Sequence, residues 1–168
     1  MKRFTLLSLF AVMAIALYAQ ASIAVFVVDD GPTNVRNKPS GDIAMQLPTE
    51  GSMCLLLEKP TNGWWKVVDV WDAEDEENPS ANLHGSTTGE YWVHHSVIGV
   101  GSRNYGGEKL VLREKPNAKA KAVYSFTEEI LLRPIDIKGN WVKVKAPNGK
   151  IGWIQDEWLC DNPLTNCC

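Results

Sequence analysis

Short apolar or alternating segments, separated by Gly, Pro, Asn and Asp, run through most of the chain. Alternation with a period of two, in segments rich in Val, Ile and aromatic residues, predicts β-strands. Pro147-Asn148-Gly149 favours a tight hairpin, because Asn-Gly tolerates the positive φ that such turns require. Five strands in so few residues predict an all-β fold that curls into a small barrel. The expected strands of this C-terminal part are residues 109–113, 121–126, 129–137, 141–146 and 150–154.

The pattern occurs twice, at an offset of 77 residues. Residues 34–39 (NVRNKP) match residues 111–116 (VLREKP), and residues 64–67 (WWKV) match residues 141–144 (WVKV). The first copy then carries 16 extra, mostly acidic and polar residues before its closing aromatic strand. Two modules are therefore predicted. They comprise residues 22–100, with an insertion at about 72–87, and residues 104–160, followed by a Cys-containing tail at 161–168.

The N-terminus has the three parts of a secretory signal peptide. Lys2 and Arg3 precede an apolar run over residues 4–18, and Ala19-Gln20-Ala21 is an A-x-A cleavage site. The run is too short for a membrane-spanning helix. We expect cleavage after Ala21, export to the bacterial periplasm or the extracellular space, and no transmembrane anchor afterwards.

Export changes the interpretation of the cysteines, because an oxidising compartment permits disulfides. Cys160 with Cys167 or Cys168 would close a short loop at the C-terminus. Cys54 lies in an apolar segment, where a buried thiol is favoured, although a second bridge to the remaining terminal cysteine is an alternative.

Several of these motifs resemble the bacterial SH3 (SH3b) family. The resemblance rests on Arg-x-x-Pro after a short strand, a central Trp-x-Lys-Val and a closing Gly-Trp-Ile. The second copy carries all three, whereas the first has Tyr91 in place of the glycine before Trp92. The resemblance implies two tandem SH3-like barrels in an exported binding protein, with peptidoglycan or peptides as partners.

Charge narrows the partners further. The formal net charge of −3 argues against nucleic acid, because phosphate contacts need a basic surface. Residues 22–98 contain 4 basic and 12 acidic side chains, net −8, whereas residues 99–168 contain 11 and 8, net +3. Opposite signs could dock the modules together or give them different partners. The apolar connection, residues 97–102, is too short for a free tether, so we expect a fixed pair with a groove between the modules.

The sequence offers no convincing catalytic or metal site. Cys54 lacks the local signature of a catalytic cysteine, and it replaces Leu131 of the other copy. His94 and His95 are adjacent in an expected strand, so their side chains should point to opposite faces. The acidic residues near the insertion lack the spacing of a calcium loop. After two modules, little chain remains for a hydrolase domain. We therefore expect no enzyme activity, no metal and no cofactor.

Aromatic residues are the best candidates for a binding surface. Alternation places Trp64 and Lys66 on one face of their strand and Trp65 and Val67 on the other. In the second copy it places Trp141 and Lys143 on the face opposite the two valines, residues 142 and 144. Such rings can stack on sugars or pack against extended peptides. Alternatively, each ring covers the open end of its own barrel. The predicted ligand-binding residues are Trp64, Lys66, Trp71, Trp92, Trp141, Lys143 and Trp153.

Three functions remain open at this point. The first is a non-catalytic protein that binds peptidoglycan or a cell-envelope peptide. The second is an interaction adaptor or an inhibitor of a cell-wall hydrolase, with the insertion as its specific contact. The third is an enzyme, which the absence of a nucleophile–base or paired-carboxylate pattern disfavours. The ligand and the oligomeric state are not determined by the sequence.

Overall fold

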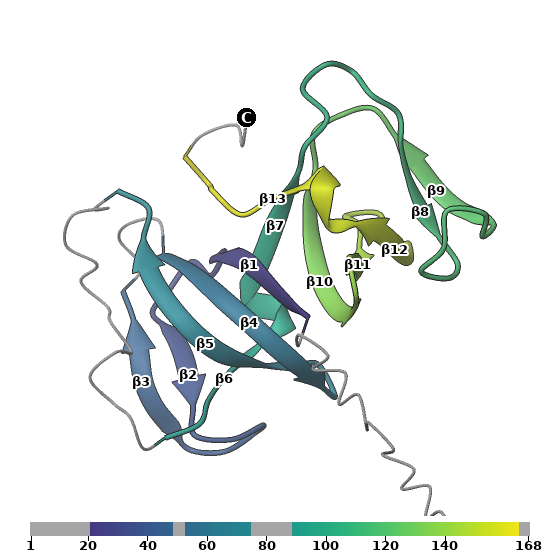
Figure 1. Ribbon diagram of the computed structural model, residues 1–168. Helices are drawn as coiled ribbons and strands as arrows, with labels where there is room; N and C mark the ends of the chain where they lie inside the picture. The colour runs from purple at the N-terminus through teal and green to yellow at the C-terminus, as the bar shows by residue number, and fades with distance from the viewer. Residues whose placement is uncertain (1–20, 49–52, 75–88, 165–168) are drawn as a thin grey trace, which may run out of the picture.

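The computed structural model describes residues 21–48, 53–74 and 89–164, and this part of the chain is all-β (Figure 1). The all-β prediction is therefore confirmed. The first strands are β1 (Ser22–Val27), β2 (Thr33–Arg36), β3 (Ile43–Leu47), β4 (Met53–Thr61), β5 (Trp64–Asp72) and β6 (Tyr91–His94). They are followed by the 3-10 helix η2 (His95–Val97), β7 (Ile98–Ser102), β8 (Leu110–Arg113), β9 (Ala122–Phe126), β10 (Leu131–Lys138), β11 (Trp141–Lys145), β12 (Ile151–Gln155), η3 (Asp156–Trp158) and β13 (Leu159–Cys160).

The five strands expected from the C-terminal pattern are β8 to β12, each within two residues of its expected ends. The predicted hairpin joins β11 to β12. Gly149 has a φ of +81°, and its N–H donates to the Ala146 carbonyl at 2.9 Å. The Asn148 side chain accepts from the Lys150 N–H at 3.0 Å. The Asn-Gly pair thus provides both the conformation and the hydrogen bonds of this turn.

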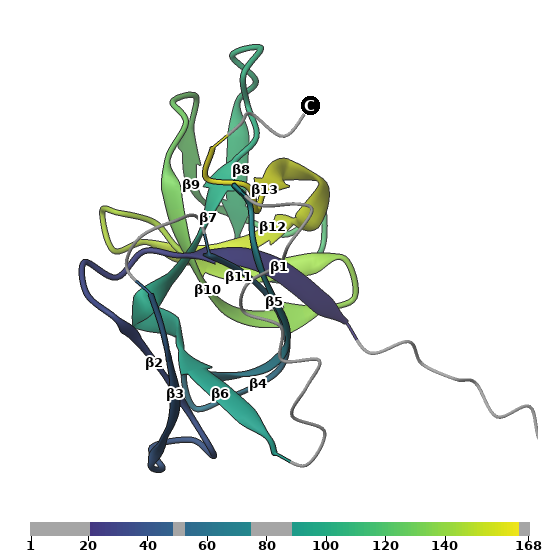
Figure 2. The ribbon, with the colours of Figure 1, turned by 90° about the vertical axis from the view of Figure 1, so that its left-hand side faces the viewer.

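The order of strand pairing repeats along the chain. In the first half, β1 to η2, strand β1 pairs with β4 and with β7, and the path continues β4-β5-β6-β2-β3. In the second half, β8 to β13, strand β7 pairs with β10 and with β13, and the path continues β10-β11-β12-β8-β9. Strand β7 therefore belongs to both halves. The segment expected to be a connection is a shared strand, which lies between the two groups of strands in Figure 1 and Figure 2.

The hydrogen-bonded strands form one open antiparallel path with β3 and β9 at its ends. Two separate closed barrels are not what this pairing shows, so the two-barrel arrangement stays a prediction. The two halves lie next to each other in Figure 1 and partly overlap in the view of Figure 2. This arrangement supports the expectation of a fixed pair.

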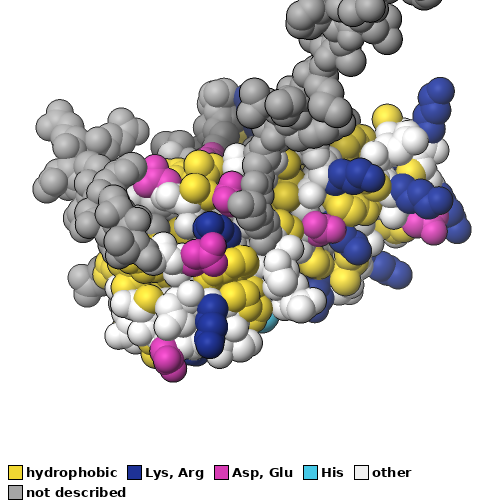
Figure 3. Space-filling model, turned by 60° about the horizontal axis from the view of Figure 1, so that its bottom comes forward, with side chains coloured by type: hydrophobic (Ala, Val, Ile, Leu, Met, Phe, Trp, Pro, Cys, Tyr) yellow, Lys and Arg dark blue, Asp and Glu magenta, His cyan; other side chains and the backbone are white. Residues whose placement is uncertain are grey.

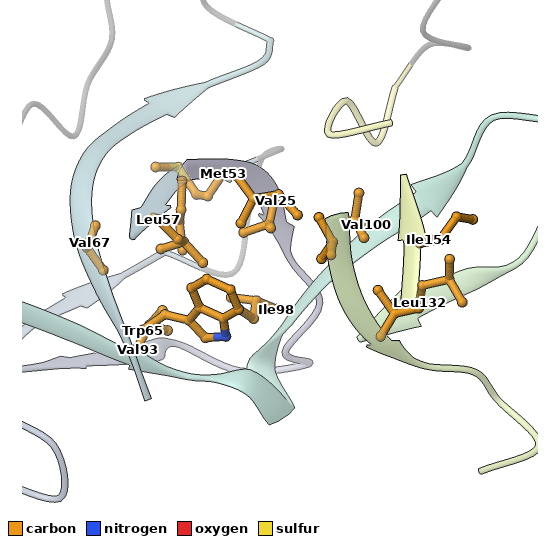
Figure 4. Close-up of a cluster of buried hydrophobic side chains, with 14 of the residues drawn as sticks. Val25, Met53, Leu57, Trp65, Val67, Val93, Ile98, Val100, Leu132 and Ile154 are labelled. Carbon is orange, nitrogen blue, oxygen red and sulfur yellow. The ribbon is translucent and has the colours of Figure 1, made fainter. Parts of the chain in front are cut away.

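The core follows the alternation predicted from the sequence. Val142 and Val144 are fully buried, and so is Trp65 on the corresponding strand of the first half. The buried side chains of both halves form a single cluster. Figure 4 shows the Trp65 indole directed toward Ile98 of β7, with Val100 and Leu132 on the side of the second half. The core is therefore continuous through β7.

Trp65 also forms a polar link between the halves. Its Nε1–H donates to the Pro134 carbonyl of β10 at 3.3 Å in a buried position. Arg133, the neighbour of Pro134, donates from Nη1 to the Ile98 carbonyl at 2.8 Å. Both bonds join residues of the first half or β7 to β10, and they add hydrogen bonds to the apolar contact at the junction.

The arginine of the repeated motif has a structural role in both halves. Arg36 Nη1 donates to the Gly41 carbonyl at 2.6 Å, and Arg113 Nη1 donates to the Ala120 carbonyl at 2.9 Å. Each bond ties the end of a strand to the loop that follows it. The arginine of the Arg-x-x-Pro motif thus holds the following loop in the same way in both halves.

The glycine of Gly-Trp-Ile is required by close packing. A Cβ atom on Gly152 would lie 2.7 Å from Val123 Cγ2 and 2.8 Å from Leu112 Cβ. The first half has Tyr91 at this position, and that ring is partly buried against the core. The departure noted in the sequence therefore reflects a different packing of β6 on its neighbours.

The extra residues of the first copy begin as an extension of the sheet. Strand β5 has nine residues where β11 has five, and its additional part pairs with the start of β4. Most of the insertion, residues 75–88, lies outside the described residues. Most of the leader, residues 1–20, also lies outside them, as do Cys167 and Cys168, the two expected partners of Cys160. Cleavage of the leader and the disulfide therefore stay predictions. Among the described residues, no helix has the length and apolarity to span a membrane.

Candidate functional site

The outer face of the second half carries basic and aromatic residues on neighbouring strands. Trp153 of β12 lies opposite Lys143 of β11 and Arg113 of β8. The Lys143 ammonium lies 6.0 Å from the centre of the Trp153 ring, at the outer limit of a cation–π contact. Both side chains are half-buried. Asp136 lies across from Lys143 on β10. The predicted residues Trp153 and Lys143 thus form one surface element, which presents a ring beside a cation.

Trp141 lies on the same outer face, two positions along β11 from Lys143. It is half-buried and lines a hollow of about 140 Å³ that also includes Arg113, Gln155 and Trp158. Trp158 lies in a short 3-10 helix, which has no sequence period that would assign a residue to one face, so the sequence alone does not indicate it. The structure therefore brings together Trp141 and a second indole that was missed.

The corresponding surface of the first half is arranged differently. Lys66 forms an ion pair with Glu90 at 3.1 Å, so its charge is compensated. Trp64 is half-buried, with the Arg36 guanidinium 5.8 Å from its ring centre and the His94 ring at 5.1 Å in an edge-on arrangement. Trp64 and Lys66 are on the predicted face, but their surroundings are not those of Trp141 and Lys143.

Two further predicted residues do not belong to an exposed aromatic surface. Trp92 lies between Arg36 and Lys66 in the sheet register, yet it is only 8 % exposed. Its indole is therefore largely covered, and its contact with a ligand stays a prediction. Trp71 is half-buried on the extension of β5, where it pairs with Cys54. It lies apart in the sheet from Trp141 and Trp153, and its contribution to binding stays a prediction.

The expectation that His94 and His95 point to opposite faces is wrong. Strand β6 ends at His94, and His95 begins η2, so strand alternation does not apply to the pair. Their ring centres lie only 4.5 Å apart. The His94 Nδ1 and Ser96 Oγ are 2.8 Å apart, within hydrogen-bond distance. The two rings therefore form one patch at the end of the first half.

The turn between β4 and β5 supports this patch. Gly63 has a φ of +83°, and its carbonyl accepts from the His95 N–H at 2.9 Å. A Cβ atom on Gly63 would lie 3.0 Å from His95 Cδ2 and 3.2 Å from His94 Nε2. Only a glycine satisfies both the conformation and the close approach. The turn thereby fixes the position of His95 against the second half.

A cleft of about 370 Å³ lies where η2 meets the second half. We call it the junction cleft. It is lined by His95, Ser96, Leu131, Arg133, Lys145, Ala146 and Pro147. The junction cleft has a position comparable to that of the expected groove, and its walls combine two cationic side chains with apolar ones. None of these lining residues is acidic.

The electrostatics of the junction cleft are visible at His95. Burial lowers the pKa of His95 below its usual value, and the nearby His94, Lys145 and Arg133 lower it further. Burial also lowers the pKa of Arg133, while Asp29 acts in the opposite direction. A positive environment disfavours a further positive charge on the imidazole. His95 is therefore held in its neutral form beside two permanent cations.

Cys54 is buried, and its Sγ–H donates to the Asp161 carbonyl at 3.4 Å. Burial, together with Asp161 and Asp72, raises the pKa of the thiol to about 12. At neutral pH the sulfur is protonated, whereas a cysteine nucleophile or metal ligand is a thiolate. Its buried position agrees with the interpretation of Cys54 as a small core residue. Over residues 21–48, 53–74 and 89–164, no group of three potential metal ligands comes together.

The charge difference between the halves is visible on the surface. In Figure 3, Lys and Arg side chains gather over the part that carries β8 to β12, whereas the part with β2 to β5 shows more Asp and Glu. The predicted asymmetry is thus visible on the face that Figure 3 shows. A basic, aromatic face on the second half and the junction cleft beside it are the two candidate sites.

Comparison with known proteins identifies a relationship for the second half of the chain. Residues 108–159 match the family model of the bacterial SH3 domain. No curated protein matches the sequence. Among solved structures, NlpC1 from Trichomonas vaginalis is 12 % identical over 84 % of this chain with a TM-score of 0.32, and NlpC2 from the same organism is 11 % identical over 83 % with a TM-score of 0.33. The chain spans 46 % and 48 %, respectively, of those two proteins.

Proposed function

We propose that this chain is a non-catalytic, exported binding protein that recognises peptidoglycan or a cell-envelope peptide. The observation that carries the proposal is the outer face of the segment that matches the bacterial SH3 domain, where Trp153, Lys143 and Trp141 lie together. Half-exposed rings next to cations provide stacking surfaces for sugars and pair with the carboxylates of peptides. The first half, which repeats the same order of strand pairing, would be a second SH3b module.

A binding role agrees with the chemistry of the described residues. The buried Cys54 thiol is held protonated, which disfavours it as a nucleophile. The rings of Trp141 and Trp153 are accessible in part, and the hollow beside Trp141 is small, at about 140 Å³. Such a surface suits a polymer that lies across it more than a small substrate that must be enclosed. The leader would direct the chain to the compartment where this polymer is found.

Retention on purified bacterial sacculi tests the proposal. The mature chain should sediment with sacculi, and the double variant Trp141→Ala, Trp153→Ala should bind on the order of tenfold more weakly, because aromatic anchors dominate the energetics of binding surfaces. Sedimentation at a series of sacculus concentrations gives the affinity of each variant.

A matched control separates the aromatic face from general surface hydrophobicity. Ile43 is 51 % exposed on β3 in the first half, far from the proposed face. Ile43→Ala should bind as the unmodified chain does. Thermal unfolding of all variants checks that folding is retained. Equal retention of the double variant and the unmodified chain would rule out this face as the binding surface.

A further inference from the structure

We propose that the junction cleft is a carboxylate-binding site that takes the C-terminal end of a short peptide with small side chains. The choice of a peptide rests on the proposed function, whereas the carboxylate is inferred from the cleft alone.

The cationic side chains converge from neighbouring strands. Arg133 of β10 and Lys145 of β11 are directly paired in the sheet register, so their side chains emerge side by side on one face. Among the described residues, neither forms an ion pair within 4.0 Å. Arg133 uses Nη1 to hold the Ile98 carbonyl, which fixes the guanidinium and leaves its other donors available for a ligand.

Two adjacent positive charges without a close acidic partner repel each other, and a bound anion would relieve that repulsion. Asp29 acts electrostatically on Arg133, but it does not line the cleft. A carboxylate accepts two parallel hydrogen bonds from a guanidinium and a third from an ammonium. The pair thus matches the geometry and charge of a single carboxylate.

The other walls limit what can accompany the carboxylate. Leu131 is 37 % exposed, and Ala146 and Pro147 follow Lys145 at the end of β11. These apolar groups suit methyl-sized side chains and offer little to a sugar hydroxyl. A volume of about 370 Å³ is near the lower end for ligand pockets, which are roughly 300–1,000 Å³. The end of a short peptide fits these limits better than a folded partner.

The probe for the test is N-acetyl-alanyl-alanine with a free C-terminal carboxylate, compared with the same dipeptide as its C-terminal amide. Binding is followed by NMR on the mature chain. The acid should shift signals of residues around the cleft and raise the pKa of His95, because a bound anion offsets the effect of Lys145 and Arg133. The amide should do neither. His95→Gln assigns the imidazole signal.

Lys145→Gln removes one cation from an exposed side chain and should weaken binding of the acid roughly fivefold or more, the scale of one lost ion pair in a partly screened site. Lys138→Gln is the matched control, because Lys138 is exposed at the other end of the same strand pair and does not line the cleft. It should leave the affinity unchanged.

Equal affinity for the acid and the amide, or no loss in Lys145→Gln, would overturn the carboxylate site. The outcome is separable from that of the proposed function. Trp141→Ala, Trp153→Ala leaves every lining residue of the cleft in place. Dipeptide binding without retention on sacculi would keep the site and reject peptidoglycan as the polymer that the aromatic face recognises. Retention on sacculi without dipeptide binding would reject the site and keep the proposed function.

Discussion

The charge of His95 depends on groups that are distant in the sequence. Burial, the neighbouring His94 ring and the two cations of the second half all favour the neutral imidazole. The unfolded chain lacks these surroundings, so its imidazole takes up a proton near the ordinary pKa of about 6.5. The free energy of unfolding must therefore depend on pH wherever the unfolded state binds more protons.

We expect the contribution of neutral His95 to stability to be complete above about pH 7 and to be lost as the pH falls through its lowered folded-state pKa. Urea unfolding at about pH 7.5 and about pH 5 measures this change. In His95→Gln, which does not titrate, the loss of stability between the two pH values should be smaller. An identical loss in both proteins would show that the surroundings of His95 do not affect its protonation.

At the scale of elements, the packing of β7 requires that its neighbouring strands approach its backbone closely. A Cβ atom on Gly99 would lie 2.6 Å from Leu131 Cδ1 and 3.0 Å from Val28 Cγ1, so β1 and β10 both approach this residue. Gly101, two positions along the same face, has more room, because the nearest atom to its Cβ would be the Cys160 carbonyl at 3.5 Å. The two glycines therefore serve as a matched pair.

Gly99→Ala should lower the free energy of unfolding by about 1 kcal/mol, at the low end for overpacking, because the end of the partly exposed Leu131 side chain can shift. Gly101→Ala should change it by less than about 0.5 kcal/mol, because an ordinary van der Waals contact replaces open space. Chemical denaturation of the two variants gives both values. Equal effects would mean that the close approach at Gly99 does not contribute to the stability of the junction.

At the scale of the whole molecule, the shared strand and the continuous core make the halves one structural unit. Trp65 occupies the position that corresponds to Val142, yet its larger side chain spans the junction and donates to the Pro134 carbonyl. When the donor of a buried hydrogen bond is removed, the acceptor stays buried without a partner, and its full desolvation penalty lowers stability. Trp65 thus links the halves in a way that its counterpart does not.

Trp65→Phe keeps an aromatic ring but removes the donor, so the free energy of unfolding should fall by about 1–3 kcal/mol. Trp153→Phe, at a half-exposed ring on the outer face, should change it by no more than about 0.5 kcal/mol. The unmodified chain should unfold in one transition, followed by fluorescence and by circular dichroism. Two separate transitions would contradict the continuous core.

Local patterns account for much of the fold. The alternating pattern predicted the ends of strands β8 to β12 to within two residues, and it placed Val142 and Val144 in the core. It succeeds there because successive side chains of a strand point to opposite faces whatever the strand packs against. The Asn-Gly hairpin and the loop hydrogen bonds of the two arginines also depend on residues close in the sequence. The same reasoning failed at His95, where the strand ends one residue earlier than expected.

The sequence by itself determined the all-β class, the two-fold repeat and the aromatic residues Trp141 and Trp153 as a candidate surface. Tertiary structure decided the rest. It placed Trp92 in the core, made the expected connection into the shared strand β7, and brought Arg133 and Lys145 against His95. The physical reason is that periodicity reports which face a residue occupies, whereas a cleft between halves depends on long-range packing that no local period encodes.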